Sequence, residues 1–345
     1  KNQEKIFVIG HKNPDTDSIC SAIAYCDIKN RTTQESRYIP KRAGQINEET
    51  EYVLNRFGVH PPGYLSNIGT QVKDMDIRLS PEANKSMSLK NAWDLMQENS
   101  IVSLPIREKD GTLEGLITIG DIAKTYMDTT DSYLLSRART QYQRIAETIG
   151  GKVIEGNAHG YFIQGKIMVA TANPDKMKEY VEENDMVIMG NREEDHLQAI
   201  EQNVSCIIVG MGIEVTEKVL KLAHEKDIVI ISSPYDTFTI SRLINQSIPV
   251  KYIMKTDNLV TFNTEDFTDD IQEVMIKHRH RAFPVINKKG KCIGTISRRN
   301  FLDMHRKKVV LVDHNEKDQA VDNIDKADIM EIIDHHKLGT LQTMQ

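Results

Sequence analysis

The stretch that most constrains this chain is residues 11–18, which read His-Lys-Asn-Pro-Asp-Thr-Asp-Ser. The apolar run at residues 6–10 predicts a buried strand before it, and the Asn-Pro pair predicts a turn. Residues 19–29 predict a helix with Ser18 as its N-cap. A strand, an acidic turn and a helix in this order are typical of open α/β sheets, which bind ligands at the carboxyl ends of their strands. The imidazole and the two carboxylates of this turn are suitable ligands for divalent cations.

Two further apolar runs end in the same kinds of side chain. Residues 309–312 lead into Asp-His-Asn-Glu, and residues 329–333 lead into Asp-His-His. If all three strands are parallel, their carboxyl ends meet at one edge of a sheet, and the crowded carboxylates need cations to neutralise them. We therefore predict two divalent ions bridged by one carboxylate; the alternative interpretation is solvated loop acids and ordinary histidines. The side chains predicted to enclose the site are His11, Asp15, Asp17, Asp313, Asp334 and His335.

These three motifs resemble those of the DHH phosphoesterases and, within that superfamily, those of the family II inorganic pyrophosphatases. The resemblance implies an enzyme that hydrolyses inorganic pyrophosphate to two phosphates at a dinuclear site, which prefers manganese or cobalt and also accepts magnesium. The metal ligands that it implies are His11 and Asp15 for one ion, Asp17 and His335 for the other, and Asp313 as the bridge.

The same resemblance implies that His336 faces the substrate phosphate, so His336 and Asp313 are the predicted catalytic residues. It leaves open whether Asp334 is a direct ligand. Members of the family carry a second catalytic lobe after the Asp-His-His motif, whereas this chain ends at Gln345. We therefore expect that the chain lacks this lobe, and its hydrolytic activity on its own stays open.

An internal repeat lies between the motifs. Residues 103–122 match residues 282–301 at a constant offset of 179 residues. Each copy predicts a helix, a strand, a glycine turn, a strand and a helix, and so small a unit must pack against its twin. The copies resemble paired CBS modules, which bind adenine nucleotides. This resemblance implies that binding of AMP or ADP lowers the enzyme's activity and that binding of ATP or a diadenosine polyphosphate raises it. It also implies that the modules assemble the chain into a homodimer or a higher oligomer.

The resemblance to CBS modules also implies individual nucleotide contacts. Thr118 and Asp121 would hold a ribose in the first copy; Ser297 and Asn300 fit less well in the second, because Asn accepts a hydroxyl only through its amide oxygen. The alternative is that Thr118 and Ser297 only cap helices. The guanidinium of Arg298, or of the arginine after it, suits a phosphate. The segments implied to face adenine through their backbone contain Ser103, Leu104 and Pro105 in the first copy and Ala282, Phe283 and Pro284 in the second.

The region between the copies alternates predicted strands and helices, which favours a parallel sheet. Its position resembles that of the DRTGG domain of some regulated pyrophosphatases, although residues 190–192 keep little of that motif. The predicted fold class is therefore α/β: a parallel-sheet DHH catalytic domain interrupted by a pair of CBS modules that flank an α/β DRTGG-like domain. The predicted boundaries are residues 1–69 with 306–345 for the catalytic domain, 70–130 and 248–305 for the CBS modules, and 131–247 for the DRTGG-like domain.

Composition narrows the classes of function. A net charge of −6 disfavours nonspecific binding of nucleic acid, and the absence of an apolar run of 18 residues predicts no membrane segment. Four cysteines without a Cys-x-x-Cys pair suit a reducing compartment, so we expect a cytoplasmic protein.

Two other functions remain as alternatives. One is a DHH-type phosphoesterase acting on polyphosphate, an oligoribonucleotide or a cyclic dinucleotide, which ranks second because aromatics are only 6% and a nuclease needs stacking platforms and a basic groove. The other is a non-catalytic adenine-nucleotide sensor.

Overall fold

The computed structural model describes residues 4–34, 37–127, 131–302 and 304–344. The chain divides into two compact units. The first consists of Lys1–Arg78, Phe262–Lys288 and Ile296–Gln345, and the second of Leu79–Thr261 and Lys289–Thr295. The confirmed fold class is α/β with parallel sheets. No helix within the described ranges combines the length and the apolar character that crossing a bilayer requires.

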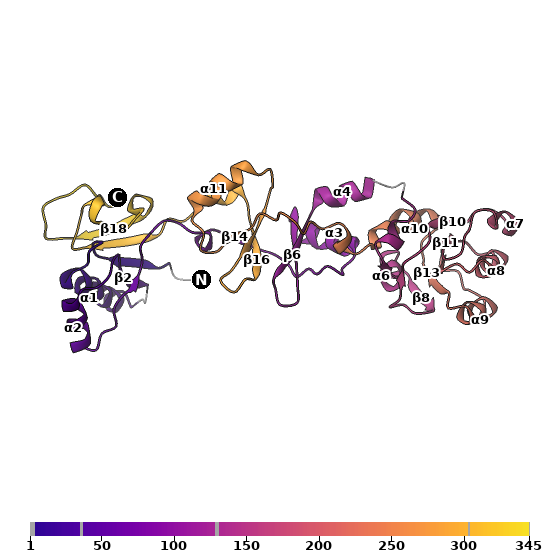
Figure 1. Ribbon diagram of the computed structural model, residues 1–345, viewed down its shortest axis with the longest axis horizontal. Coiled ribbons are helices and arrows are strands. Elements are labelled where there is room, and N and C mark those ends of the chain that lie inside the picture. The colour runs from indigo at the N-terminus through magenta and orange to yellow at the C-terminus, as the bar shows by residue number, and fades with distance from the viewer. Residues whose placement is uncertain (1–3, 35–36, 128–130, 303, 345) are drawn as a thin grey trace. The chain divides into compact units, whose positions relative to one another are not determined.

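A five-stranded sheet built from both ends of the chain organises the first unit, and we call it the terminal sheet. Its order is β18-β17-β1-β2-β3, and each neighbouring pair is parallel. Figure 1 shows the indigo strand β2 and the yellow strand β18 in this sheet. Because all five strands run the same way, their carboxyl ends lie at one edge. The bounds are β1 Ile6–Ile9, β2 Tyr38–Arg42, β3 Gly63–Tyr64, β17 Lys308–Val312 and β18 Asp328–Ile333.

Both faces of the terminal sheet are covered, as parallel sheets require. Along β17, Val309 and Leu311 pack with Ile9 on one face, while Val310 and Val312 pack on the other face, which helix α1 (Thr16–Thr33) covers. The helix begins three residues before the predicted position because Asp15, not Ser18, is its N-cap. Helix α2 (Glu48–Arg56) packs beside α1.

The second repeat copy contributes further elements to the first unit. Strand β14 (Phe262–Asn263) pairs in parallel with β15 (Phe283–Ile286), and helix α11 (Thr268–Lys277) lies between them in sequence. A helix was predicted after Ser297, but the structure has a 3-10 turn at Arg298–Phe301 instead. The remaining named elements here are the 3-10 turns Val72–Asp74, Lys317–Gln319 and Ile324–Lys326. Strands β4 (Arg78–Leu79) and β16 (Cys292–Ile296) include residues of both units.

The second unit begins with the first repeat copy. Helix α3 (Leu89–Glu98), strand β5 (Ser103–Arg107), strand β6 (Leu113–Thr118) and helix α4 (Ile119–Met127) follow in the predicted order. Strands β5 and β6 pair antiparallel, with Ser103 opposite Thr118. The main chain of the repeat thus brings the start of one strand to the end of the other.

The rest of the second unit surrounds another sheet, which we call the insertion sheet. Its order is β10-β11-β12-β13-β8; the first four strands are parallel and β8 is antiparallel, which the sequence did not predict. Figure 1 shows α7, α8 and α9 on one face and α6 and α10 on the other. The strands are β7 Thr140–Gln141, β8 Lys152–Glu155, β9 Tyr161–Phe162, β10 Ile167–Val169, β11 Met186–Met189, β12 Cys206–Val209 and β13 Val229–Ser232. The helices are α5 Leu134–Arg137, α6 Tyr142–Thr148, α7 Pro174–Met177, α8 Glu193–Glu201, α9 Glu217–Glu225 and α10 Thr237–Leu243, and the 3-10 turns are Ile244–Ser247 and Val250–Tyr252.

Candidate metal centre

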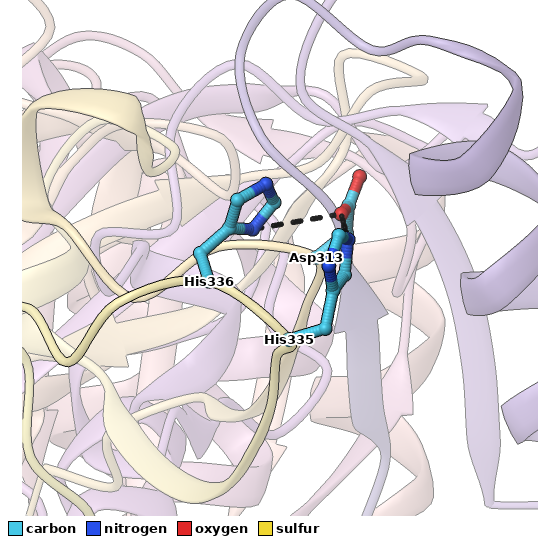
Figure 2. A group of neighbouring side chains, drawn as sticks. All are labelled: Asp313, His335 and His336. Atoms are coloured by element: carbon cyan, nitrogen blue, oxygen red, sulfur yellow. Dashed lines mark ion pairs between the residues drawn. The ribbon is translucent and has the colours of Figure 1, made fainter.

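Three strands of the terminal sheet deliver the predicted ligands to one edge. His11 follows β1, Asp313 follows β17, and the His335-His336 pair follows β18. The His11 Nε2 atom lies 3.4 Å from Asp313 Oδ2, and His335 Nε2 lies 3.4 Å from Asp313 Oδ1. His336 Nδ1 is 3.9 Å from the same Oδ1 (Figure 2). Segments that are about 300 residues apart in sequence therefore meet around one carboxylate.

Asp313 is the central group of this cluster. Its side chain is only 6% exposed, and its backbone has a φ of 61°, a left-handed conformation that Asp tolerates better than most residues. Burial raises the pKa of its carboxyl above the usual value, and the charges of Asp17 and Asp15 raise it further. The opposing effect of the nearby imidazoles is smaller. A negative charge at this position is thus costly unless a cation lies beside it.

The acidic turn after β1 forms the other side of the cluster. Asp15 Oδ1 accepts the Ser18 N–H at 2.9 Å as the helix cap and also lies 3.8 Å from His11 Nε2. Asp17 is in the first turn of α1, where its Oδ2 lies 3.7 Å from His335 Nε2. Both carboxylates are more than half exposed. The turn therefore presents its acids to the rim of the site, where ligands can reach them.

Asp334 belongs to the same motif, but its carboxylate is engaged with neighbouring protein groups. Its Oδ1 accepts His336 N–H at 3.2 Å and lies 2.6 Å from His336 Nδ1, and its Oδ2 accepts the Asn315 side-chain amide at 2.5 Å. Burial alone would raise the pKa of Asp334, but the His336 hydrogen bonds outweigh it and the pKa falls below its usual value. The same contact raises the pKa of His336. Asp334 thus orients His336 and favours its charged form.

His314 is a residue that sequence reasoning did not single out. It is 1% exposed, and its ring packs edge-on against His11 with the centroids 6.4 Å apart. Its Nδ1 lies 2.9 Å from the Val312 carbonyl, which can only accept, so Nδ1 carries the proton. Burial lowers the pKa of this ring, which leaves it neutral, and its Nε2 has no hydrogen-bond partner among the described residues. Its position could have been noticed in the sequence, because His314 directly follows Asp313 in the same motif.

This donor set fits divalent cations. Two groups of side chains have potential ligand atoms within 4.8 Å of one another: one consists of His11, Asp15 and Asp313, the other of Asp313, His335 and His336. Asp313 belongs to both groups and offers a different oxygen to the imidazole on each side. Mixed carboxylate and imidazole donors suit first-row divalent metals, and a carboxylate shared by two groups is what a dinuclear centre requires.

The predicted ribose pair of the first repeat copy lies at the end of β6. Both the backbone N–H and the Oγ1 hydroxyl of Thr118 donate to Asp121 Oδ2, at 2.9 and 2.6 Å, and the other Asp121 oxygen lies 3.6 Å from Lys255 Nζ. Ser103 faces Thr118 across the strand pair. Leu104 and its neighbour Pro105 are buried, so this segment offers a ligand its backbone and not its side chains.

The second copy repeats the pattern with an amide. The N–H and hydroxyl of Ser297 donate to Asn300 Oδ1 at 2.7 and 2.9 Å, and Asn300 Nδ2 donates to the Asp76 carbonyl at 2.6 Å. The Arg298 guanidinium donates to backbone carbonyls at the end of α11 and just after it, which occupies donors that a phosphate would need. Phe283 is fully buried against Phe262, with the rings 5.3 Å apart. Its neighbours on either side are Ala282, half-buried, and Pro284, buried.

Comparison with known proteins adds two domain families and several relatives. The DRTGG domain model matches residues 144–247, and the CBS domain model matches residues 76–128 and 250–307. The chain is 38% identical over 342 residues to the cobalt-dependent inorganic pyrophosphatase of Clostridium perfringens. It is 32% identical over 344 residues to a probable manganese-dependent inorganic pyrophosphatase of Thermotoga maritima. These alignments cover 99% and 100% of this chain but 62% of each relative.

A solved structure is similar to the part of this chain that the CBS and DRTGG domain models match. It contains the CBS and DRTGG domains of the regulatory region of the Clostridium perfringens pyrophosphatase in complex with its activator, diadenosine tetraphosphate. The match has a TM-score of 0.63 and 34% sequence identity, and it covers 66% of this chain and 100% of that one.

Proposed function

Because the chain belongs to the inorganic pyrophosphatases that carry CBS and DRTGG domains, we propose that it forms the metal-binding and regulatory part of a pyrophosphatase controlled by adenine nucleotides. The reaction is hydrolysis of inorganic pyrophosphate to two phosphates with Mn²⁺ or Co²⁺, the metals in the names of the relatives. The observation that carries this proposal is the buried Asp313 carboxylate, whose two oxygens lie 3.4 Å from His11 Nε2 and from His335 Nε2.

In this proposal, His11 and Asp15 hold one cation, Asp17 and His335 help to hold the other, and Asp313 serves both. When bound, the cations supply a water of lowered pKa and neutralise charge on the phosphoryl oxygens. The protein holds the backbone of Asp313 in place from two sides, through the β17 strand end and the hydrogen bond from Asp313 N–H to the Ile333 carbonyl at 2.9 Å, and burial restricts its side chain. Such a fixed bridge needs no rearrangement when charge develops on the substrate.

His336 is the proposed contact to the substrate phosphate. Asp334 Oδ1 holds Nδ1 of the His336 ring, and this contact raises the pKa of His336, which favours the charged imidazolium. The other ring N–H is then left to donate a charged hydrogen bond to a phosphate oxygen. More than half of the His336 side chain is exposed, so an anion can reach it. An imidazolium in this position stabilises the extra negative charge that gathers on the phosphoryl oxygens in the transition state.

The proposed regulatory ligands are AMP and ADP as inhibitors and ATP or a diadenosine polyphosphate as activators. The support is the activator in the similar regulatory region and the Thr118–Asp121 pair, whose hydroxyl and carboxylate are the groups that recognise ribose hydroxyls. The second copy, with Ser297, Arg298 and Asn300, is the proposed partner half. We further propose a homodimer, which sedimentation velocity tests, and a reducing compartment such as the cytoplasm, since the four cysteines of the sequence include no Cys-x-x-Cys pair and Cys20, Cys26 and Cys206 form no disulfide.

The deciding experiment measures phosphate release from pyrophosphate by the complete protein after chelation and reloading with Mn²⁺, together with metal content by elemental analysis. We expect no turnover in the chelated protein and about two Mn²⁺ per chain after reloading. The competing substrates are short RNA, polyphosphate and a cyclic dinucleotide. Faster cleavage of any of these than of pyrophosphate, or nucleotide binding without any metal-dependent hydrolysis, would overturn the proposal.

A further inference from the structure

A linker in the first unit is hydrogen-bonded to the two parts that the proposed regulation must connect. On one side, the Ile68 N–H donates to the Asp322 carbonyl at 3.0 Å, close to the terminal sheet. On the other side, the Val72 N–H donates to the Asp266 carbonyl at 2.9 Å, in the second CBS domain. The linker, residues 66–74, is thus bound at one end to the segment between β17 and β18 of the terminal sheet and at the other to the second CBS domain.

Lys307, which lies on the chain's return path to the terminal sheet, holds this linker. Its Nζ donates to the Gly69 carbonyl at 2.9 Å and to Gln71 Oε1 at 3.0 Å, and it lies 3.2 Å from Asp74 Oδ2. The side chain is 10% exposed, and Asp74 is 24% exposed. An ammonium at this depth with three oxygen partners is costly to leave unpaired, so the contact holds or breaks as a unit. We call these four residues the Lys307 clamp.

Beside the clamp lies a cavity of about 1640 Å³, which is lined by residues of both parts, among them Lys73, Glu265 and Asp328. Where this space lies, the terminal sheet and the second CBS domain do not pack directly against each other. The linker joins them there through polar contacts, which include the clamp and the backbone bonds of Thr70, Val72 and Lys73 to the second CBS domain. The clamp is therefore one polar contact at which the two parts can shift relative to each other.

Lys307 is also directly linked to the metal centre. It immediately precedes β17 (Lys308–Val312), and Asp313 follows the strand. Since β17 is buried on both faces and paired with a strand on each side, a shift at its start reaches its carboxyl end without being absorbed by a loop. We propose that the Lys307 clamp is the coupling device through which nucleotide binding in the CBS domains changes the activity of the metal centre, an inference that rests on the proposed function.

The test uses Lys307→Met, which keeps most of the length of the side chain and removes its charge, and Asp74→Asn, which removes the partner charge. The matched control is Lys308→Met, because the adjacent Lys308 makes a surface ion pair with Glu4 at 2.7 Å. In the complete protein, we expect all three variants to hydrolyse pyrophosphate without nucleotide at nearly the wild-type rate. The ratio of rates with and without saturating AMP should fall to about one in both clamp variants and stay unchanged in the control.

Two further readouts separate loss of coupling from loss of folding. The AMP dissociation constant, from calorimetry on the chain itself, should stay within about twofold of wild type in each clamp variant. Hydrogen exchange should accelerate at the amides of residues 70–73 and stay unchanged in the insertion sheet. If either single variant unfolds because it leaves one charge unpaired, the double variant Lys307→Met with Asp74→Asn removes both charges. It should restore folding without restoring the AMP response.

The outcomes are distinct. A wild-type protein that hydrolyses no pyrophosphate or ignores AMP overturns the proposed function, and the clamp with it. A wild-type protein that responds to AMP, together with a Lys307→Met variant that responds equally, overturns the clamp alone. An equal loss of response in Lys308→Met also overturns it, because any charge removed at the start of β17 would then have the same effect.

Discussion

The proposed metal centre and the Thr118–Asp121 pair both combine side-chain oxygens at the end of a strand, but the polar groups in the two places have different partners. Burial raises the pKa of Asp313 and the neighbouring carboxylates raise it further, so its charge needs a partner from outside the protein. Asp121 already accepts two hydrogen bonds from Thr118. A cluster of like charges thus indicates a bound ligand more directly than a hydrogen-bonded pair does. The pair is stable whether or not a ligand is bound, whereas the cluster is not.

The largest effect should come from removing the bridge. Asp313→Asn keeps the shape of the side chain and lowers pyrophosphate turnover by about a thousandfold, since a shared metal ligand contributes several kcal/mol to the transition state. The control is Asp318→Asn, an exposed acid in the turn after the same strand, which should leave turnover unchanged. Elemental analysis should find fewer bound metal ions only in the Asp313 variant. Full turnover in Asp313→Asn would contradict a bridging role.

A smaller loss is expected from Asp334→Asn. Removing the group that orients His336 should cost about 10- to 100-fold in turnover, the usual range for residues that position others at a metal site. Since both residues act through one contact, His336→Gln combined with Asp334→Asn should lose little more than either alone. Steady-state kinetics on the two single variants and the double variant test this expectation. A loss of bound metal in Asp334→Asn as large as that in Asp313→Asn would instead indicate that Asp334 is a direct ligand.

Metal removal should distinguish the two regions by stability. A cation at about 100 times its dissociation constant stabilises the folded state that binds it by roughly 2.7 kcal/mol. In calorimetry, Mn²⁺ should therefore raise the unfolding temperature of the transition that contains the terminal sheet. The transition of the insertion sheet should stay where it is. Equal shifts of both transitions, or a full shift in Asp313→Asn, would argue against a site at Asp313.

The smallest effect concerns the Thr118–Asp121 pair. It distinguishes a role of Thr118 in binding nucleotide from a role in capping a helix. Thr118→Val keeps the shape and removes the hydroxyl, and we expect about a tenfold weaker affinity for AMP, with Thr118→Ser close to wild type. Ser297→Ala in the second copy should weaken binding less, because its Asn300 partner carries no charge. If Thr118 only caps a helix, Thr118→Val costs about 1 kcal/mol of stability and leaves the AMP dissociation constant unchanged. Titration calorimetry and thermal unfolding together make this distinction.

Much of the architecture could be predicted because it depends on local patterns. Each apolar run followed by Asp or His became a strand with its chemistry at the carboxyl end, and parallel pairing then brought the three ends together. The two family models likewise match a DRTGG domain between two CBS domains. These features follow from hydrophobic periodicity and an internal repeat, both of which a single sequence displays.

What could not be predicted depends on side-chain direction and competition between nearby groups. The sequence shows that Asp334 adjoins the histidines, but only the fold shows that Asn315 and His336 hold its two oxygens. Asp15 displaced Ser18 as the helix cap, since a carboxylate three residues before an N–H competes well for it. The antiparallel direction of β8 was also missed, because pairing direction has no local signal.

The register of the terminal sheet has a consequence for how the protein is made. The central strand β1 pairs with β17 from Ile6↔Lys308 to Ile9↔Leu311. Strand β17 therefore leaves the ribosome about 300 residues after β1 does. Until β17 is made, β1 has an unpaired edge, which is a template for wrong pairing. The strands of the insertion sheet all lie between β1 and β17 in sequence, so that sheet can fold first. Closure of the sheet, and with it the assembly of the proposed metal ligands, is therefore the late step in biogenesis. Slowing translation between residues 100 and 300 should prolong exposure to chaperones without altering the finished molecule.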